Sequence, residues 1–131
     1  MVALAKAFAQ AGVKPKRTIL FAAWTAEERG LHGSTYFVNS FQNPERIKYY
    51  LNYDMIGRDP DPNNPTMNTA FIYTEANKEL EDMTNDANDS LNLDLNIRYA
   101  PVARPVQGSD QAPFARKEIP IMWYHTGGHD D

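Results

Sequence analysis

The spacing of hydrophobic residues along the chain predicts helices alternating with strands. Residues 2–11 carry apolar side chains three or four positions apart, which predicts a helix that Gly12 and Pro15 end. The next apolar run, TILFAAW at residues 18–24, has no polar alternation and predicts a strand covered on both faces. Apolar residues at helical spacing return over residues 31–41, so a second helix is expected there.

The same alternation continues to the end of the chain. Further strands are predicted over residues 46–57, 69–74, 93–100 and 119–124, and further helices over residues 75–90 and 112–117. Residues 58–68 are rich in Pro, Asn and Asp and predict a surface loop. Strands that alternate with helices predict an α/β domain whose sheet has helices on both faces. In open sheets of this kind, ligands bind beyond the carboxyl ends of the strands.

Composition removes several classes of function. The 131 residues suit one domain, and 42% hydrophobic residues are typical of a globular chain. A net charge of −4 without a basic run argues against a nucleic-acid partner. No segment approaches the roughly 18 apolar residues of a membrane span, and Lys6 interrupts the N-terminal apolar run, so no signal peptide is predicted. The absence of cysteine excludes disulfides, thiolate nucleophiles and cysteine-based zinc sites.

Acidic and imidazole side chains gather where the predicted strands end. Glu27 and Glu28 follow the first strand, Asp54 ends the second, and His125 and His129 lie just beyond the last. Carboxylates and imidazoles are the ligands that catalytic zinc takes, and a pair of zinc ions about 3.5–4 Å apart needs several of them. A glutamate next to a ligand glutamate could take a proton from water as a general base.

Each of these residues also has a structural explanation. The segment Thr25-Ala26-Glu27-Glu28 matches a capping box, in which the acids would only stabilise a helix start. Asp54 is harder to explain in this way, because it follows a predicted buried strand where an unpaired carboxylate is unfavourable. Either histidine could be a hydrogen-bonded or surface residue. Ser109 and Asp110 could be a nucleophile with an acid, or an Asx-type turn before a short helix.

Four motifs in order resemble those of the M28 family of zinc exopeptidases, the aminopeptidase and glutamate-carboxypeptidase-like group. These motifs are FAAWTAEERGLHGSTYF, NYDMIG, GSDQAPF and IPIMWYHTGGHDD. The resemblance implies the phosphorylase/hydrolase-like α/β fold of zinc exopeptidases and a site for two zinc ions. Over residues 1–131 it covers only the latter part of the family's catalytic domain, so the resemblance implies a truncated, partial domain.

The resemblance also implies roles for single residues. Glu27 would be the general base, Glu28 a ligand of one zinc, and Asp54 a ligand of the other. Each zinc in the family also takes a histidine, and a bridging aspartate is shared; the first histidine and the aspartate match no residue here. His129 matches the histidine of the T-G-x-H segment, which is not ordinarily a ligand, and a register with Tyr124-His125 as the ligand pair stays open.

The remaining expectations follow from the same resemblance. Ser109 and Asp110 would lie on the substrate side or around the ligands, in a motif where the family often has histidine at the position of Gln111. The substrate would be a peptide, the isolated chain would be inactive, and export as a secreted or periplasmic protein is implied. A glutaminyl-cyclase-like single-zinc acyltransferase and a non-catalytic binding scaffold are the alternatives. A sheet lacking upstream strands should expose an edge or apolar surface, which predicts self-association.

Overall fold

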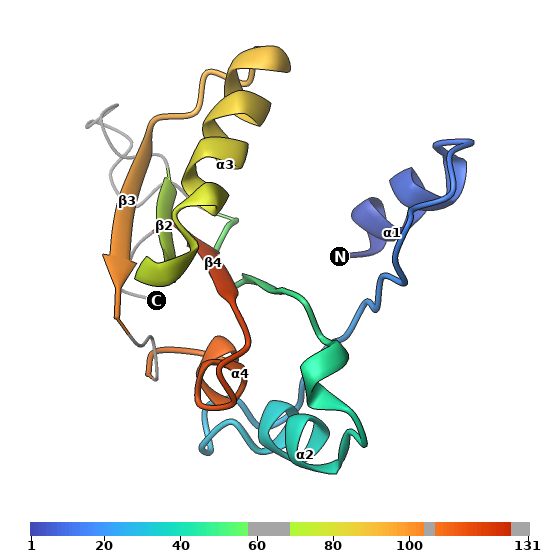
Figure 1. The fold of residues 1–131 in the computed structure, drawn as a ribbon, viewed down its shortest axis with the longest axis vertical. Coiled ribbons are helices and arrows are strands. Elements are labelled where there is room, and N and C mark those ends of the chain that lie inside the picture. Colours follow the sequence, from blue (N-terminus) through green and yellow to red (C-terminus); the bar gives the residue numbers. More distant parts are fainter. Residues whose placement is uncertain (58–68, 104–106, 127–131) are drawn as a thin grey trace.

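A computed structural model describes residues 1–57, 69–103 and 107–126 (Figure 1). The elements follow in the order α1 (Val2–Gln10), α2 (His32–Ser40), β1 (Tyr50–Tyr53), β2 (Thr69–Thr74), α3 (Glu79–Ser90), β3 (Ile97–Val102), α4 (Gln111–Ala115) and β4 (Ile121–His125). Two short 3-10 turns, Pro44–Arg46 and Glu75–Asn77, precede β1 and α3. None of the helices in these ranges has the length and apolar character needed to cross a membrane.

The four strands form one mixed sheet with the order β1-β4-β2-β3. The last strand of the chain, β4, lies in the centre, parallel to β1 and antiparallel to β2, while β2 and β3 are parallel to each other. Tyr124 of β4 is therefore opposite Tyr53 on one side and Phe71 on the other. Because β1 and β4 run in the same direction, the residues that follow β1 and those that end β4 meet at one edge of the sheet.

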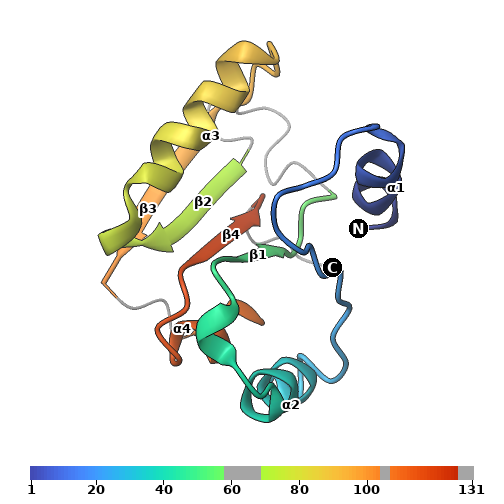
Figure 2. The same ribbon diagram turned by 45° about the vertical axis from the view of Figure 1, so that its right-hand side comes forward.

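Two hydrophobic clusters cover opposite faces of this sheet, as the alternation of strands and helices predicts. Figure 2 shows the helices that carry them, with α3 beside β2 and β3 and with α4 and α2 near the starts of β1 and β4. Ile121 packs with α2 and α4 through Val38 and Phe114. The next residue, Met122, packs on the other face with Leu80 of α3 and with Phe71. Successive residues of a strand point to opposite faces, so β4 separates the two clusters. The expected sheet with helices on both faces is thus confirmed.

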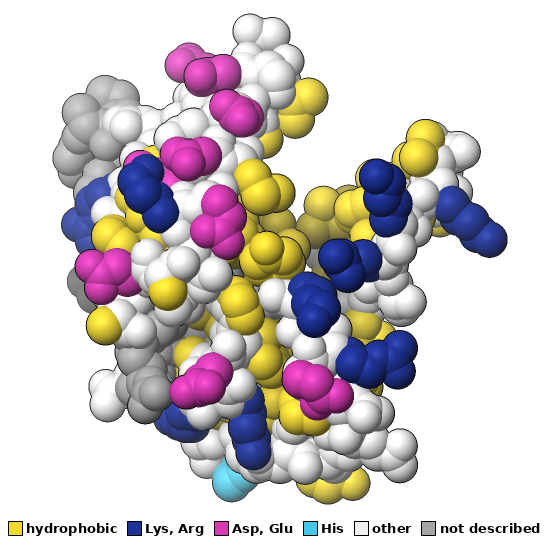
Figure 3. Space-filling view, in the orientation of Figure 1, with side chains coloured by type: hydrophobic (Ala, Val, Ile, Leu, Met, Phe, Trp, Pro, Cys, Tyr) yellow, Lys and Arg dark blue, Asp and Glu magenta, His cyan; other side chains and the backbone are white. Residues whose placement is uncertain are grey.

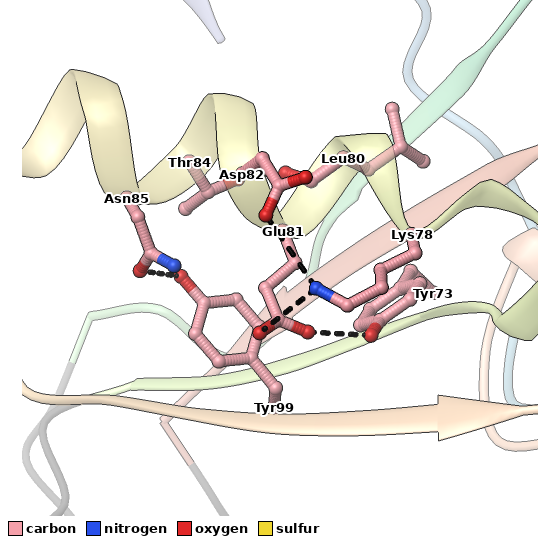
Figure 4. A network of polar contacts seen from close by, with 8 residues as sticks. All are labelled: Tyr73, Lys78, Leu80, Glu81, Asp82, Thr84, Asn85 and Tyr99. Carbon is pink, nitrogen blue, oxygen red and sulfur yellow. Dashed lines mark hydrogen bonds and ion pairs between the residues drawn. The ribbon is translucent and has the colours of Figure 1, made fainter.

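Polar contacts hold α3 against its face of the sheet (Figure 4). The hydroxyl of Tyr73 on β2 donates a hydrogen bond to Glu81 at 2.6 Å, and the hydroxyl of Tyr99 on β3 donates to Asn85 at 2.5 Å. Lys78 lies 3.8 Å from Glu81 and 3.5 Å from Asp82, but it is largely exposed, and such pairs contribute little to stability. The tyrosine contacts therefore define the position of α3 more than the ion pairs do.

The strand expected at residues 18–24 is not formed, and this prediction was wrong. The segment is extended, but it pairs with no strand among the described residues, and Leu20 is 65% exposed. A strand requires a hydrogen-bonded neighbour, which local apolar character alone cannot supply. The preceding helix, α1, has no buried residue and lies across from α3, away from the sheet (Figure 1).

Candidate active site

The paired glutamates lie in a turn that comes before α2. The helix begins at His32 after Leu31, whose φ of 59° is left-handed, and it has neither a side-chain cap nor an acidic residue in its first turn. The capping-box explanation is therefore wrong for Glu27 and Glu28. The turn is closed by main-chain hydrogen bonds instead, for example from the amide of Leu31 to the carbonyl of Glu27 at 2.9 Å.

A second acidic residue, Asp54, follows β1 and is held by two neighbours. Its amide donates to the carbonyl of Tyr124 at 3.2 Å, which fixes its main chain beside the end of β4. The hydroxyl of Ser109 donates to Oδ2 of Asp54 at 2.6 Å. A hydroxyl that donates to one carboxylate oxygen fixes the orientation of the carboxylate and leaves the other oxygen able to accept from another partner. Ser109 thus orients Asp54 and is not arranged as a nucleophile.

The next residue, Asp110, is bound by α2 rather than by the sheet. Ser34 of α2 donates from its hydroxyl to Oδ1 of Asp110 at 2.5 Å, and Asp110 itself is only 8% exposed. Burial raises the pKa of Asp110 above its ordinary value; the Ser34 hydrogen bond opposes this rise, and the charge of Asp54 adds to it. Asp110 precedes α4, so this bond joins the start of α4 to the first turn of α2.

The pKa of Glu27 is affected by the other acidic residues of the candidate site. Its pKa is raised first by burial and then by the negative charges of Glu28, Asp110 and Asp54, in that order. These charges come from three separate segments, namely the turn before α2, the end of β1 and the start of α4, and each is near enough to Glu27 to raise its pKa. A group with a raised pKa holds a proton more readily, which is the property required of a general base that must also return the proton.

The two candidate histidines stand differently. His125 is the last residue of β4 and stacks on Trp123 with ring centroids 4.5 Å apart. Burial lowers the pKa of His125, the nearby Arg98 lowers it further, and Asp54 acts in the opposite direction. The imidazole is therefore favoured in its neutral form and lies within the electrostatic reach of Asp54. His129 lies outside the described residues.

The carboxylates offer the chemistry of zinc ligands but not a full set of them. Oxygen donors from Glu28 and Asp54 suit zinc, and the crowding of negative charge around Glu27 is what a bound cation would relieve. Over residues 1–57, 69–103 and 107–126, however, no three histidine, aspartate or glutamate side chains are grouped so that they could hold a metal ion. Catalytic zinc usually has three protein ligands, so the described donors fit the ion only in part.

Three buried polar residues of the site were not identified from the sequence as site residues. They are Ser34, Asn52 and Gln111, and each is at most 7% exposed. The amide nitrogen of Asn52 donates to Ser109 at 2.9 Å and to Gln111 at 3.2 Å, so Asn52 supports the residue that orients Asp54. For Asn52 the signal in the sequence was the presence of a polar residue within an apolar strand.

An aromatic cluster packs against Trp24, which leads into the glutamate turn. Trp24 donates from its indole nitrogen to the hydroxyl of Tyr50 at 2.9 Å, and Tyr50 stacks on Phe114 with ring centroids 3.9 Å apart. Phe37 of α2 lies 5.0 Å from Trp24, measured between ring centroids. The residue that leads into the glutamate turn is thereby packed between β1, α2 and α4, which positions the start of the turn.

Comparisons with known proteins agree with this arrangement. The model of peptidase family M28 matches residues 1–131. Leupeptin-inactivating enzyme 1 of Streptomyces exfoliatus is 34% identical over 125 residues, which are 94% of this chain and 26% of that protein. Leucine aminopeptidase 2 of Trichophyton rubrum is 33% identical over 120 residues, which are 87% of this chain and 23% of that protein.

A solved structure gives the same assignment. The LapA aminopeptidase of Legionella pneumophila superposes with a TM-score of 0.60 and 25% identity, over 80% of this chain and 27% of the LapA chain. The chain therefore spans about a quarter of the length of the relatives that it matches. With a match over all of its residues and the expected fold, the chain belongs to peptidase family M28.

Proposed function

We propose that residues 1–131 are part of the catalytic domain of a dizinc aminopeptidase. Glu27 is the general base, Glu28 is a ligand of one zinc ion, and Asp54 is a ligand of the other. The observation that carries this proposal is the rise in the pKa of Glu27 caused by burial and by Glu28, Asp110 and Asp54. A carboxylate whose pKa is raised by burial and by other acids is typical of a functional site.

Glu27, Ser109 and Asp54 each have a defined role in the proposed reaction. A carboxylate oxygen of Glu27 accepts a proton from the attacking water and delivers it to the leaving amine. Ser109 holds Oδ2 of Asp54, which leaves Oδ1 as the oxygen that would hold the zinc ion. Zinc, when bound, supplies the positive charge that lowers the pKa of water and polarises the scissile carbonyl.

We further propose that the isolated chain is inactive. Glu28 and Asp54 give each zinc one ligand, and the described residues contain no group of three donors that would hold the ion. Weak binding of zinc would leave Glu27 beside ordinary water, whose pKa is too high for this base. His125 is one described residue that could add a nitrogen donor, because burial and Arg98 lower its pKa and so favour the neutral imidazole.

The test is an assay of aminoacyl-nitroanilide hydrolysis with added zinc. The 131-residue chain is compared with a longer chain of the same protein and with the Glu27→Gln variant of each. The proposal expects turnover only in the longer chain and a fall of at least about 100-fold in kcat for its Glu27→Gln variant, since a general base contributes about 10²–10⁴-fold. Equal turnover by both wild-type chains would contradict the proposed inactivity of the 131-residue chain. Full activity of the Glu27→Gln variant would show that Glu27 is not the general base.

The reaction class and the location of the protein are part of the same proposal. Two of the relatives are named leucine aminopeptidase and leupeptin-inactivating enzyme, which supports a peptide substrate, and the first of these names supports a substrate with a free amino end. A count of one zinc per complete chain, with cyclisation of N-terminal glutamine, would favour the glutaminyl-cyclase-like alternative. Absence of any turnover in the longer chain would favour a binding scaffold.

Export is proposed from the family resemblance, and recovery of the protein outside the producing cells tests it.

We also propose that copies of the chain associate through exposed apolar surface. Hydrophobic side chains gather in the hollow between α3 and the N-terminal segment (Figure 3). Leu51 and Tyr53 of the edge strand β1 are 48% and 47% exposed, and Met83 of α3 is 60% exposed. A surface of this kind can be covered by a second copy. Light scattering should give a mass that rises with concentration, and a mass of 14.9 kDa at every concentration would contradict the proposal.

A further inference from the structure

One glycine of α2 touches the main chain of the glutamate turn. Gly33 is the second residue of the helix, and a Cβ added to it would lie 2.7 Å from the nitrogen and 2.9 Å from the oxygen of Thr25. Real Cβ atoms do not come this close to other atoms, and both contacts are with main-chain atoms, which cannot rotate away as a side chain can. Any side chain at position 33 must therefore displace Thr25.

Thr25 is the first residue of the turn that carries Glu27 and Glu28. The amide of Gly33 donates to the carbonyl of Thr25 at 3.0 Å, and the amide of His32 donates to the carbonyl of Ala26 at 3.3 Å. Ala26 has a φ of 56°, a left-handed conformation that is unfavourable for a residue with a Cβ. Such a conformation persists only when its surroundings determine it, and here the surroundings are the first turn of α2.

The same turn of α2 is fixed to the rest of the site on its other side. Ser34, the neighbour of Gly33, binds Asp110 at the start of α4, and Ser109 binds Asp54. Both serines are at most 1% exposed, and the bond between Ser34 and Asp110 is buried, so water does not easily replace it. A displacement between Gly33 and Thr25 would consequently move the two glutamates relative to Asp54 and Asp110, which stay with α4 and β1.

We propose that Gly33 is a positioning residue of the active site. Its missing side chain allows the main chain of Thr25 to lie against α2, and this contact sets how far Glu27 and Glu28 stand from Asp54. The catalytic consequence rests on the proposed function of these acids, whereas the structural consequence does not. Gly33 does not need its own conformational freedom for this role, because its backbone is helical; it needs the space.

The structural part is tested in the 131-residue chain without metal. In the wild-type chain, NMR should show a strong contact between the Hα of Gly33 and the amide proton of Thr25. In Gly33→Ala, hydrogen exchange of the Leu31 and His32 amides should become at least about 10-fold faster, because their acceptors are the carbonyls of Glu27 and Ala26. Gly57→Ala is the matched control, since a Cβ there meets no atom of the described part of the chain within 4 Å.

The NMR contact and the exchange rates each decide on the positioning role of Gly33. Absence of the Gly33–Thr25 contact in the wild type would overturn the proposal even if the variant does not fold. Unchanged exchange of the Leu31 and His32 amides in a folded Gly33→Ala variant would overturn it as well. Faster exchange confined to these amides, with the control unchanged, supports it.

The catalytic part is tested in the longer, active chain. Gly33→Ala should lower kcat by about 10–100-fold, because a displacement of about 1 Å at reacting groups can have an effect of this size. KM should stay within about twofold, since the variant removes no substrate contact, and Gly57→Ala should leave both constants within about twofold. An inactive wild type would refute the proposed function and leave the exchange experiment to decide on Gly33. An active wild type with unchanged kcat in Gly33→Ala would overturn the positioning role.

Discussion

Replacement of Ser109 by alanine tests how the site holds Asp54. The hydroxyl of Ser109 is 1% exposed, donates to Asp54 at 2.6 Å and accepts from the amide nitrogen of Asn52 at 2.9 Å. Ser109→Ala removes both hydrogen bonds and leaves a buried amide and a carboxylate with one partner fewer. The fold itself should survive, because the β-carbon and the packing around it are kept.

The magnitude follows from the two bonds and from what can replace them. A hydrogen bond to a charged group contributes about 1.5–3 kcal/mol and one between neutral groups about 0.5–1.5 kcal/mol. Asp54 is only half-buried, so water can replace part of the first bond, and Asn52 keeps its bond to Gln111 at 3.2 Å. We therefore expect Ser109→Ala to lower the free energy of unfolding by about 2 kcal/mol, towards the low end of the combined range.

The assay is urea unfolding of the 131-residue chain followed by tryptophan fluorescence. Ser40→Ala is the matched control, because the Ser40 hydroxyl is exposed and bonds only within its own helix. The control should change the free energy of unfolding by less than about 0.5 kcal/mol. A double-mutant cycle with Asp54→Ala should return a coupling of about 1 kcal/mol or more between positions 109 and 54.

Two results would refute this reasoning. A loss for Ser109→Ala no greater than that for Ser40→Ala would mean that the hydroxyl does not hold Asp54 in solution. A full loss with zero coupling to Asp54→Ala would mean that the stabilisation comes from Asn52 alone, and that the orientation of Asp54 has another origin.

Three further predictions concern the supports of the site. Phe114→Ala should lower the free energy of unfolding in urea by about 3–5 kcal/mol, because Phe114 is 1% exposed and stacks on Tyr50. The control Phe41→Ala, at a position that is 39% exposed, should lower it by less than half as much. Asp110→Asn should raise the melting temperature at pH 7, because the pKa of Asp110 is raised in the folded chain. The contribution of Asp110 to the free energy of unfolding is then full below its ordinary pKa of 3.8 and is lost as the pH rises through the raised pKa. Thermal melts of the wild type between pH 4 and 7 that show no such decline relative to the variant would contradict this electrostatic effect. Gly108→Ala should destabilise the chain by more than about 1 kcal/mol in the same assay, because φ is 103° and the new Cβ would meet the ring of Trp123 at 2.8 Å; equal stability would show that the ring can move aside.

Much of the architecture could be predicted from local pattern alone. The runs over residues 46–57 and 69–74 contain β1 and β2, and the apolar run after Ile119 contains β4. These predictions succeeded because period and strand-forming residues are properties of a few neighbouring positions. The position of Asp54 at the end of β1 could also be predicted, since the carboxyl end of a strand can be read from the sequence once the strand is known. The order of the four motifs was enough to identify the family.

The arrangement of the site depended on tertiary structure. Ser109 and Asp54 are 55 positions apart, and Ser34 and Asp110 are 76 positions apart, so no local pattern could pair them. The capping-box pattern around Glu28 and the apolar pattern at residues 18–24 both predicted elements that did not form there, because a helix start and a strand are decided by the partners that the fold provides. The residue types of a site are local information. Their distances are set by packing between segments, here through Gly33, whose lack of a side chain matters only because the main chain of Thr25 folds back against it.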